Sequence, residues 1–416
     1  MREKWNPQPF DHSETISETE SWGARARQLW REKLGSFEEL VKHNSFLFET
    51  GIGMEIPGIE DKTGRVIVHK DRSVLPNLGK IMESYGLSTL PAVAFIVAST
   101  VTAEEVNAVK GLAREMKEAG VQAVFPFLKY VAHGRQDHKF TDSGSGQKME
   151  QVTTLKDVME TLSRYCDGAI LLHPHSHRSI DFGLRLGFPV LPLDGLKMLL
   201  AKSGYRGAQN LIELGPDAGR QDAARVAADF FGCPLLSVEK IRSRLKGGRP
   251  TIIWPDGARE WIREHGYTVV ITDDEIKDAG TTDAIAEDLK KYTDDVRIIA
   301  VSAVMTPEVV ARKIIRDGEL VDVAPADEWM ASSAVQKLDK SHIREILITD
   351  AVQPIADLTP IADKVRIIPL EPEIGALVGY LQENWIPTGP EWLRNPDQTG
   401  TLLSLDLTVE SVNHKS

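Results

Sequence analysis

The chain has 416 residues, more than one hydrophobic core usually contains, so two domains are expected. Its 61 Asp and Glu residues outnumber its 49 Lys and Arg residues, and the net charge is −12. An acidic protein repels nucleic-acid phosphates and anionic lipid. We therefore expect neither a nucleic-acid nor a membrane partner, and the composition favours a small-molecule ligand.

Cysteine usage and hydrophobic runs indicate the compartment. Only Cys166 and Cys233 occur, both in apolar stretches. They form neither a disulfide framework nor a zinc-ligand spacing, and we expect both to fill the core. Residues 1–20 are polar and acidic, unlike a signal peptide, and no run of about 18 apolar residues occurs. These features predict a soluble, cytoplasmic protein.

The first half of the chain predicts a helical extension followed by an α/β domain. Residues 1–44 carry aromatic side chains among charges, which suggests an added helical arm with some docking surface. Beyond them, apolar runs that predict strands alternate with apolar residues at helical spacing. The expected strands are residues 92–98, 121–125, 169–172 and 188–191. We assign residues 45–198 to this domain.

The second half repeats this alternation. It predicts a second α/β domain, residues 199–386, and a tail, residues 387–416. The expected strands are residues 210–214, 234–237, 268–272, 296–301, 346–349 and 365–370, and the expected helices are residues 222–230, a helix after Gly280, and residues 374–381. The last two strands and the last helix complete this domain or return to the first. Alternation of this kind predicts parallel sheets with helices on both faces, and ligands bind at the carboxyl ends of such strands.

The loop after the strand 268–272 combines two carboxylates with a turn of small residues. Asp273 and Asp274 are able to accept hydrogen bonds from two vicinal sugar hydroxyls. The residues that follow are Lys277, Asp278, Ala279, Gly280, Thr281 and Thr282. The amides of the last four open a helix, and a helix N-terminus suits a phosphate. The alternative is that the two aspartates merely cap this helix.

Two further strand-end loops carry groups that suit phosphates and magnesium. In residues 215–220, small residues let the backbone approach a polyphosphate, and Asp217 offers Mg²⁺ a hard oxygen ligand. After the strand 234–237, Lys240 and Arg242 alternate, and alternate residues of an extended segment point the same way. An ordinary turn around Asp217 and two solvated cations are the alternatives.

Strand ends in the first domain also carry polar groups. After the strand 121–125 come Arg135, Gln136 and Asp137. An Arg-Gln pair suits the phosphates and base edges of ATP, although charged residues beyond a strand are often simply solvated. His173 follows the strand 169–172 and opens a run with two further histidines, so a transition-metal site is an alternative there.

Taken in order from about Phe95 to Leu381, these loops resemble those of the ribose-phosphate pyrophosphokinases, or PRPP synthetases. The matching segments are the Arg-Gln-Asp stretch, the Pro-Asp-Ala-Gly loop around Asp217, and the Ala-Gly-Thr turn after the acid pair. The resemblance implies two tandem type I phosphoribosyltransferase-like domains with parallel central sheets. It also implies a homo-oligomer built from dimers.

The resemblance further implies an activity and a role for each candidate residue. The activity is ATP-dependent transfer of a diphosphoryl group to the C1 hydroxyl of ribose 5-phosphate, which gives PRPP and AMP. Lys240 and Arg242 would act on the migrating group. The implied ATP-binding residues are Arg135, Gln136, Asp137 and His173; the implied Mg²⁺ ligands are His173 and Asp217; and the implied ribose-phosphate-binding residues are Asp217, Asp273, Asp274 and residues 277–282.

Two departures from the family pattern leave the exact activity open. Lys277 and Asp278 stand where the family has Asp-Thr, and a carboxylate there would repel a dianionic phosphate. The acceptor is therefore either plain ribose 5-phosphate or another ribosyl phosphate such as ADP-ribose. The family's N-terminal adenine motif has no counterpart that we can locate. The pattern is also compatible with a phosphoribosyltransferase or with a non-catalytic regulatory subunit.

Overall fold

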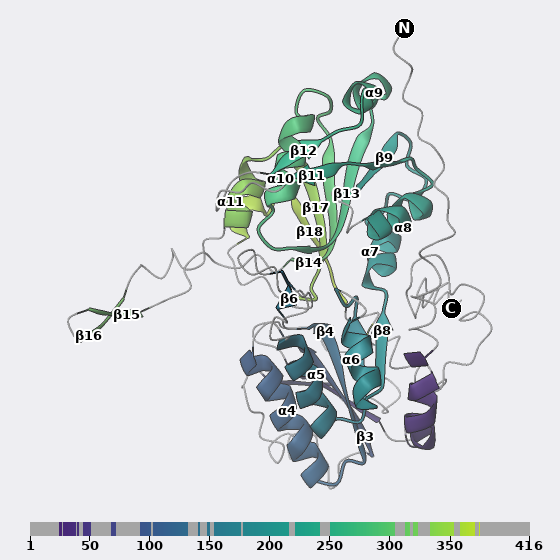
Figure 1. Ribbon diagram of the computed structural model, residues 1–416, viewed down its shortest axis with the longest axis vertical. Coiled ribbons are helices and arrows are strands. Elements are labelled where there is room, and N and C mark those ends of the chain that lie inside the picture. Colours follow the sequence, from purple (N-terminus) through teal and green to yellow (C-terminus); the bar gives the residue numbers. More distant parts are fainter. Residues whose placement is uncertain are drawn as a thin grey trace, which may run out of the picture. The chain divides into compact units, whose positions relative to one another are not determined.

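The computed structural model describes two units of the chain (Figure 1). The residues described are 25–26, 28–38, 40, 45–50, 68–71, 92–100, 103–131, 140–141, 148–149, 154–175, 178–215, 221–241, 250–303, 313–316, 319–322, 333–352, 358–370 and 374. The N-terminal unit holds the described residues up to Gly195 together with Leu370 and Ile374. The C-terminal unit holds those from Leu196 to Pro369.

A six-stranded parallel sheet forms the centre of the N-terminal unit. Its order is β2-β1-β3-β4-β7-β8. The strands are β1 (Ser45–Thr50), β2 (Val68–Asp71), β3 (Val93–Ser99), β4 (Ala123–Tyr130), β7 (Ala169–Leu172) and β8 (Val190–Leu193). The other elements are α4 (Ala103–Glu118), α5 (Thr154–Tyr165), α6 (Arg178–Leu186) and an antiparallel pair of β5 (Phe140–Thr141) with β6 (Lys148–Met149).

The helical residues before β1 belong to the core of this unit. Residues 28–34 are helical, followed by a 3₁₀ turn, η1 (Gly35–Phe37). Trp30 is 1% exposed, and its ring centroid lies 5.8 Å from that of Phe125 in β4. A Cβ on Gly168 would lie 3.2 Å from Leu34 and 3.0 Å from the Pro189 carbonyl oxygen. The absence of a side chain at Gly168 therefore allows this helix to pack closely.

The C-terminal unit is built on a second six-stranded parallel sheet, in the order β10-β9-β13-β14-β17-β18. Its strands are β9 (Leu211–Gly215), β10 (Leu235–Ser237), β13 (Thr268–Ile276), β14 (Val296–Ala303), β17 (Ile343–Thr349) and β18 (Val365–Ile368). Its helices are α7 (Gly195–Ser203), α8 (Gln221–Phe231), α9 (Ala258–His265), α10 (Gly280–Leu289), α11 (Ser333–Lys340) and the 3₁₀ helix η4 (Thr359–Ile361).

Helices cover both faces of this sheet, as the alternating sequence predicts. Apolar side chains of α9, α10 and α11 form one core cluster with the strands, including Ile262, Ile285 and Leu338. Helix α8 packs on β9 and β13 and lies on the opposite face from α10 and α11 (Figure 1). Two antiparallel strand pairs form separate two-stranded sheets: β11 (Glu239–Ile241) with β12 (Thr251–Ile253), and β15 (Lys313–Arg316) with β16 (Glu319–Asp322).

The predicted strands exist, but several ends differ from those expected. The most consequential is β13, which we expected to end at Thr272 and which continues to Ile276. The reason is that β14 also continues, to Ala303, and pairs with it beyond the acidic residues, as in Glu275 with Ser302. The acid pair therefore lies within the strand rather than in the loop after it.

A polar network closes the amino end of this sheet. Glu345 at the start of β17 accepts hydrogen bonds from Arg297 Nη1 at 3.3 Å, from Arg366 Nε at 2.9 Å, and from the Tyr205 hydroxyl. Arg366 also donates to the Lys202 and Ser203 carbonyls at the end of α7. Burial, followed by the hydrogen bond to Glu345, raises the pKa of Tyr205 to about 12. The network thus attaches the end of α7 to three strands.

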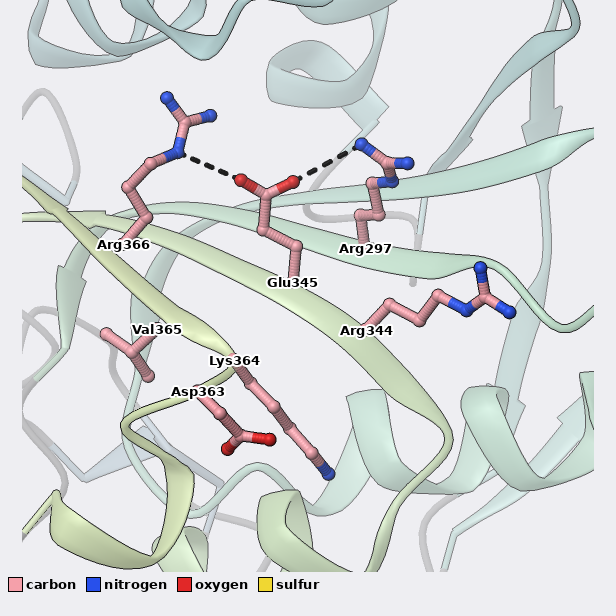
Figure 2. Close-up of a pocket in the computed structure, with 7 residues that line it drawn as sticks. All are labelled: Arg297, Arg344, Glu345, Asp363, Lys364, Val365 and Arg366. Atoms are coloured by element: carbon pink, nitrogen blue, oxygen red, sulfur yellow. Dashed lines mark hydrogen bonds and ion pairs between the residues drawn. The ribbon is translucent and has the colours of Figure 1, made fainter.

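This network lines a pocket of about 350 Å³, in which Glu345 lies between Arg366 and Arg297 (Figure 2). Its remaining lining residues are Arg344, Asp363, Lys364 and Val365. Lys364 donates to the carbonyls of Leu338, Asp339 and Ser341 at the end of α11. Three of the four cations are thus engaged in structural contacts, and the pocket lies at the end of the strands opposite to the predicted ligand loops.

We predict that Glu345→Ala destabilises the C-terminal unit by about 1–3 kcal/mol, because three donors lose their shared acceptor. The measurement is urea unfolding, with hydrogen exchange of β14 and β17 to localise the effect. The matched control is Glu287→Ala, which removes only an exposed pair with Lys290 at 3.7 Å and should change stability by less than about 0.5 kcal/mol. Equal losses in both variants would contradict the structural role of Glu345.

Candidate functional site

The C-terminal unit brings two of the predicted motifs together beside the carboxyl end of β13. Lys240 in β11 donates a hydrogen bond from Nζ to Oγ1 of Thr281, in the first turn of α10, over 3.0 Å. Lys240 is half-buried, whereas its neighbours Glu239 and Ile241 are exposed, since adjacent residues of a strand face opposite ways. The ammonium group therefore lies at the loop predicted to bind a sugar phosphate.

The acid pair differs in accessibility. Asp273 is half-buried, and its Oδ1 accepts a hydrogen bond from the Asp274 backbone N–H at 2.9 Å. Asp274 is 7% exposed, and the next residue, Glu275, is 6% exposed. Asp273 is therefore the carboxylate of this pair that a ligand reaches more readily.

The turn between β13 and α10 contains its own anion. Ala279, the residue before α10, has φ 53°, a left-handed conformation that few residues other than glycine adopt. The exposed Asp278 turns back so that its Oδ1 accepts a hydrogen bond from the Gly280 N–H at 3.1 Å. A carboxylate thus holds one of the helix amides that we expected to meet a phosphate.

A second lysine, not predicted from the sequence, contacts this turn. Lys337 in α11 donates from Nζ to the Asp278 carbonyl oxygen over 3.0 Å. Lys337 lies in the last turn of α11, which is basic. In the sequence, this pattern predicts only a favourable interaction of the lysine with the helix dipole. The cation–loop contact depends on the packing of α10 against α11.

The N-terminal unit places His173 at the carboxyl end of β7. Its φ is 41°, an unusual value for a residue with a side chain, and its N–H donates to the Leu193 carbonyl oxygen at 2.7 Å. Its Nδ1 lies 3.6 Å from Oδ1 of Asp194, which directly follows β8 and is 8% exposed. Sequence reasoning missed Asp194, although its position after a neighbouring strand is the signal that would have indicated it.

Five of the predicted site residues lie outside the described residues: Arg135, Gln136, Asp137, Asp217 and Arg242. Their roles stay predictions. Lys277 is exposed and Thr282 is buried at the turn described above. Among the residues that the structure describes, no group of three or more His, Cys, Asp or Glu side chains lies close enough to hold a metal ion.

Both cysteines serve packing. Cys166 is 7% exposed and belongs to the core cluster of the N-terminal unit. Cys233 is partly buried, and burial raises the pKa of its thiol to about 12, so the reactive thiolate is scarce at neutral pH. None of the helices formed by the described residues is long and apolar enough to span a membrane.

The two sheets define the class of protein. Each is parallel and doubly wound, and its strand order reverses direction after its first strand, β1 in one unit and β9 in the other. This is the architecture of two tandem type I phosphoribosyltransferase-like domains. The crystal structure of phosphoribosylpyrophosphate synthetase from Mycobacterium smegmatis has the same fold, with a TM-score of 0.54 and 16% identity over 82% of this chain and 99% of that chain.

Curated proteins that share one name are similar to the chain in sequence. Ribose-phosphate pyrophosphokinase from Halobacterium salinarum is 24% identical over 261 residues, which cover 62% of this chain and 77% of the relative. The protein of the same name from Saccharolobus solfataricus is 25% identical over 178 residues, 41% of this chain and 53% of the relative. No family model matches the chain. The chain is thus similar in sequence to the ribose-phosphate pyrophosphokinases, as a divergent relative, and shares the fold of a phosphoribosylpyrophosphate synthetase.

We predict that Asp278→Asn increases the affinity of the protein for ribose 5-phosphate about fivefold, because removing one charge near a bound phosphate contributes about 1 kcal/mol. Asparagine retains an oxygen for the Gly280 N–H, so the turn itself should persist. Isothermal titration calorimetry measures the affinity. The matched control is Asp294→Asn, which removes an exposed charge next to the amino end of β14. An unchanged affinity in D278N, or an equal gain in D294N, would contradict the effect.

Proposed function

We propose that the protein transfers a diphosphoryl group from Mg-ATP to the C1 hydroxyl of ribose 5-phosphate, giving PRPP and AMP. The observation that carries the proposal is the Lys240–Thr281 contact, because this lysine lies at the start of α10, the helix that follows the acid pair in the chain. The names of the curated relatives, ribose-phosphate pyrophosphokinases, support the same chemistry.

In this proposal the C-terminal unit binds the sugar. Asp273 accepts hydrogen bonds from ribose hydroxyls, and Asp274 contributes from its more buried position. The amides of residues 279–282 and the Thr281 and Thr282 hydroxyls face the phosphate of the sugar, with Lys277 at the exposed side of the turn. These groups orient the C1 hydroxyl, and orientation of this kind accounts for much of the acceleration in phosphoryl transfer.

The reaction forms one bond and breaks another. The C1 oxygen attacks the β-phosphorus of ATP, the bond from that phosphorus to the oxygen bridging the α-phosphorus breaks, and AMP leaves with the bridging oxygen. The hydroxyl proton passes to solvent. Lys240 and Arg242 stabilise the negative charge on the migrating group, which is where preorganised cations contribute most.

The N-terminal unit binds ATP in this proposal, through Arg135, Gln136, Asp137 and His173. The Oδ1 atom of Asp194 lies 3.6 Å from Nδ1 of His173. In this proposal the carboxylate favours the tautomer of His173 with its proton on Nδ1, so that Nε2 is free of a proton and can accept a hydrogen bond. The assignment of the proton to Nδ1 belongs to the proposal. The orientation of the imidazole is supported by the backbone hydrogen bond from His173 to Leu193.

Magnesium suits the oxygen donors that these residues provide. Asp194 offers a carboxylate beside His173, and Asp217 offers another in the loop after β9. Mg²⁺ prefers oxygen ligands and is usually held by one or two carboxylates together with substrate phosphates. We therefore propose that His173 and Asp194 in the N-terminal unit, and Asp217 in the C-terminal unit, provide ligands for Mg²⁺. When bound, the ion neutralises charge on the phosphates.

A second acceptor is favoured by one observation. The Asp278 carboxylate holds the Gly280 N–H, so a dianionic 5-phosphate has to displace it or bind elsewhere. A ribosyl diphosphate such as ADP-ribose carries its charge farther from this turn and presents a less charged phosphate at the 5′ position. ADP-ribose is therefore our second candidate acceptor.

The test is AMP release from Mg-ATP by the purified protein, with ribose 5-phosphate and ADP-ribose as separate acceptors and the products resolved by mass. A gain of one diphosphate on either acceptor supports the chemistry and identifies the substrate. Consumption of PRPP without ATP turnover would favour a phosphoribosyltransferase. Absence of both activities would favour a regulatory subunit.

We predict that Lys240→Ala lowers kcat for AMP release by about 100-fold or more, the usual effect of losing a charge-stabilising group. The matched control is Lys290→Ala, which removes an exposed lysine just after α10 and should leave kcat unchanged. Retention of full kcat in K240A would refute the role of Lys240.

A further inference from the structure

Glu213 is a carboxyl group inside the core of the C-terminal unit. It stands in the middle of β9, between Ile212 and Leu214, and its exposed fraction is 0%. Ile212 and Leu214 belong to the apolar cluster on the α10 face of the sheet, so alternation directs Glu213 to the opposite face, which α8 covers. An acidic residue at such a position is unfavourable unless it makes a specific contact.

The specific contact joins Glu213 to β13. Its Oε1 accepts a hydrogen bond from the Thr272 backbone N–H at 2.9 Å. In a parallel ladder, every second amide of a strand faces the same neighbour. The Thr268 N–H donates to the Asn210 carbonyl on the β9 side, so the Thr272 N–H also faces β9. The Glu213 carboxyl thus gives this amide a side-chain acceptor beside the backbone of β9.

This contact lies where the two strands part. The pairing of β13 with β9 ends at Ile271 and Leu214, and Thr272 is the next residue. On its other side β9 remains paired with β10 as far as Gly215. The strand order reverses between β9 and β13, and such a reversal is where doubly wound sheets bind ligands. Glu213 therefore connects β9 to β13 where their pairing ends. Its partner, Thr272, directly precedes Asp273.

The surroundings favour a neutral Glu213. Burial raises the pKa of Glu213 well above its ordinary range, although Thr272 and Leu214 provide hydrogen-bond donors that lower it. The second carboxyl oxygen, Oε2, is buried without a hydrogen bond among the described residues. The nearby Cys233 thiol, its pKa raised to about 12 by burial, is also neutral at pH 7. No cation that would favour the charged form contributes to the pKa of Glu213 among the described residues.

We propose that Glu213 is a positioning residue for the sugar site: it holds Thr272, and through it the acid pair, at a set distance from β9. This inference rests on the proposed function. In this role Glu213 contacts neither substrate. It orients Asp273 and Asp274 from the neighbouring strand.

The experiment compares Glu213→Leu, Glu213→Asp and Glu213→Gln. Leucine removes the side-chain oxygen that accepts the hydrogen bond. Aspartate is one methylene too short to reach the Thr272 N–H unless the backbone moves. We expect both to raise KM for the ribosyl phosphate about tenfold, because small displacements of positioning groups have large effects, with KM for ATP within about twofold of the original. Glutamine retains an acceptor oxygen and should rescue KM.

The matched control is Ile212→Ala, which damages the same strand on its opposite face without touching Thr272. It should lower Tm as much as E213L does, yet leave KM for the sugar unchanged. A parallel rise of KM in I212A would overturn the proposal, since KM would then follow stability alone. An E213Q variant as impaired as E213L would overturn it as well.

Hydrogen exchange separates this inference from the proposed function. In E213L and E213D, the amides of residues 272–276 should exchange faster than in the original chain, in E213Q or in I212A. This result does not require turnover, so it supports the positioning role even where AMP release is absent and the proposed function fails. Unchanged exchange at Thr272 in E213L and E213D would overturn the positioning role even where the enzyme is active.

A pH series gives a second readout with the isosteric variant. A raised pKa means that the native state keeps a proton that the unfolded state loses above about pH 4.3. The stability of the original chain therefore falls relative to that of E213Q as pH rises from there towards the folded-state pKa of Glu213. We expect the Tm of E213Q relative to that of the original chain to rise as the pH increases above the unfolded-state pKa. A difference in Tm that does not vary with pH would contradict a protonated, neutral Glu213 in the folded protein.

Discussion

The end of the hydrogen-bond ladder between β9 and β13 is the constraint on which the candidate sugar site depends. β13 pairs with β9 only as far as Ile271 but remains paired with β14 to Ile276. Its last residues are therefore held firmly on one side and open on the other. Backbone groups on the open side need acceptors or donors from side chains or from a ligand. The acid pair is therefore supported on the β14 side and accessible on the β9 side. The buried carboxyl of Glu213 accepts a hydrogen bond from Thr272, the residue at which the ladder with β9 ends.

Much of the fold follows from short-range patterns in the sequence. Fully apolar runs such as Ala169–Leu172 predict buried parallel strands, and the structure places that strand at the predicted residues. Strand ends are less predictable because they depend on the partner: β13 extends past Thr272 only because β14 extends beside it. The strands β1 and β2 were not predicted, because their runs are short and end in adjacent polar residues, Glu49 and Thr50 in β1 and residues 69–71 in β2. The packing of Trp30 on Phe125 was likewise outside any local pattern.

The site could be predicted in part for the same reason. Residues that directly follow a strand are visible in the sequence, and Lys240, Asp273 and the turn at 277–282 were found in this way. Lys337, Asp194 and Glu213 were not, because each acts through a contact between segments far apart in sequence, such as Lys337 with Asp278. A lone Glu inside an apolar strand is a signal, since such a residue is rarely buried without a partner. The partner itself requires the register of β9 against β13.

Under the proposed function, binding of an anionic substrate depends on the charges near the turn before α10 more than on the net charge of −12. At physiological ionic strength, charges separated by more than about 8 Å in solvent are largely screened. At the turn before α10, the Lys240 and Lys337 ammonium groups approach from two different elements, while Asp278 opposes them from within the turn. An arriving phosphate competes with that carboxylate for the Gly280 N–H and shares the lysines with it. Under the proposed function, the position of the Asp278 carboxylate would therefore decide between acceptors, because the acid pair and the small-residue turn suit any ribosyl phosphate.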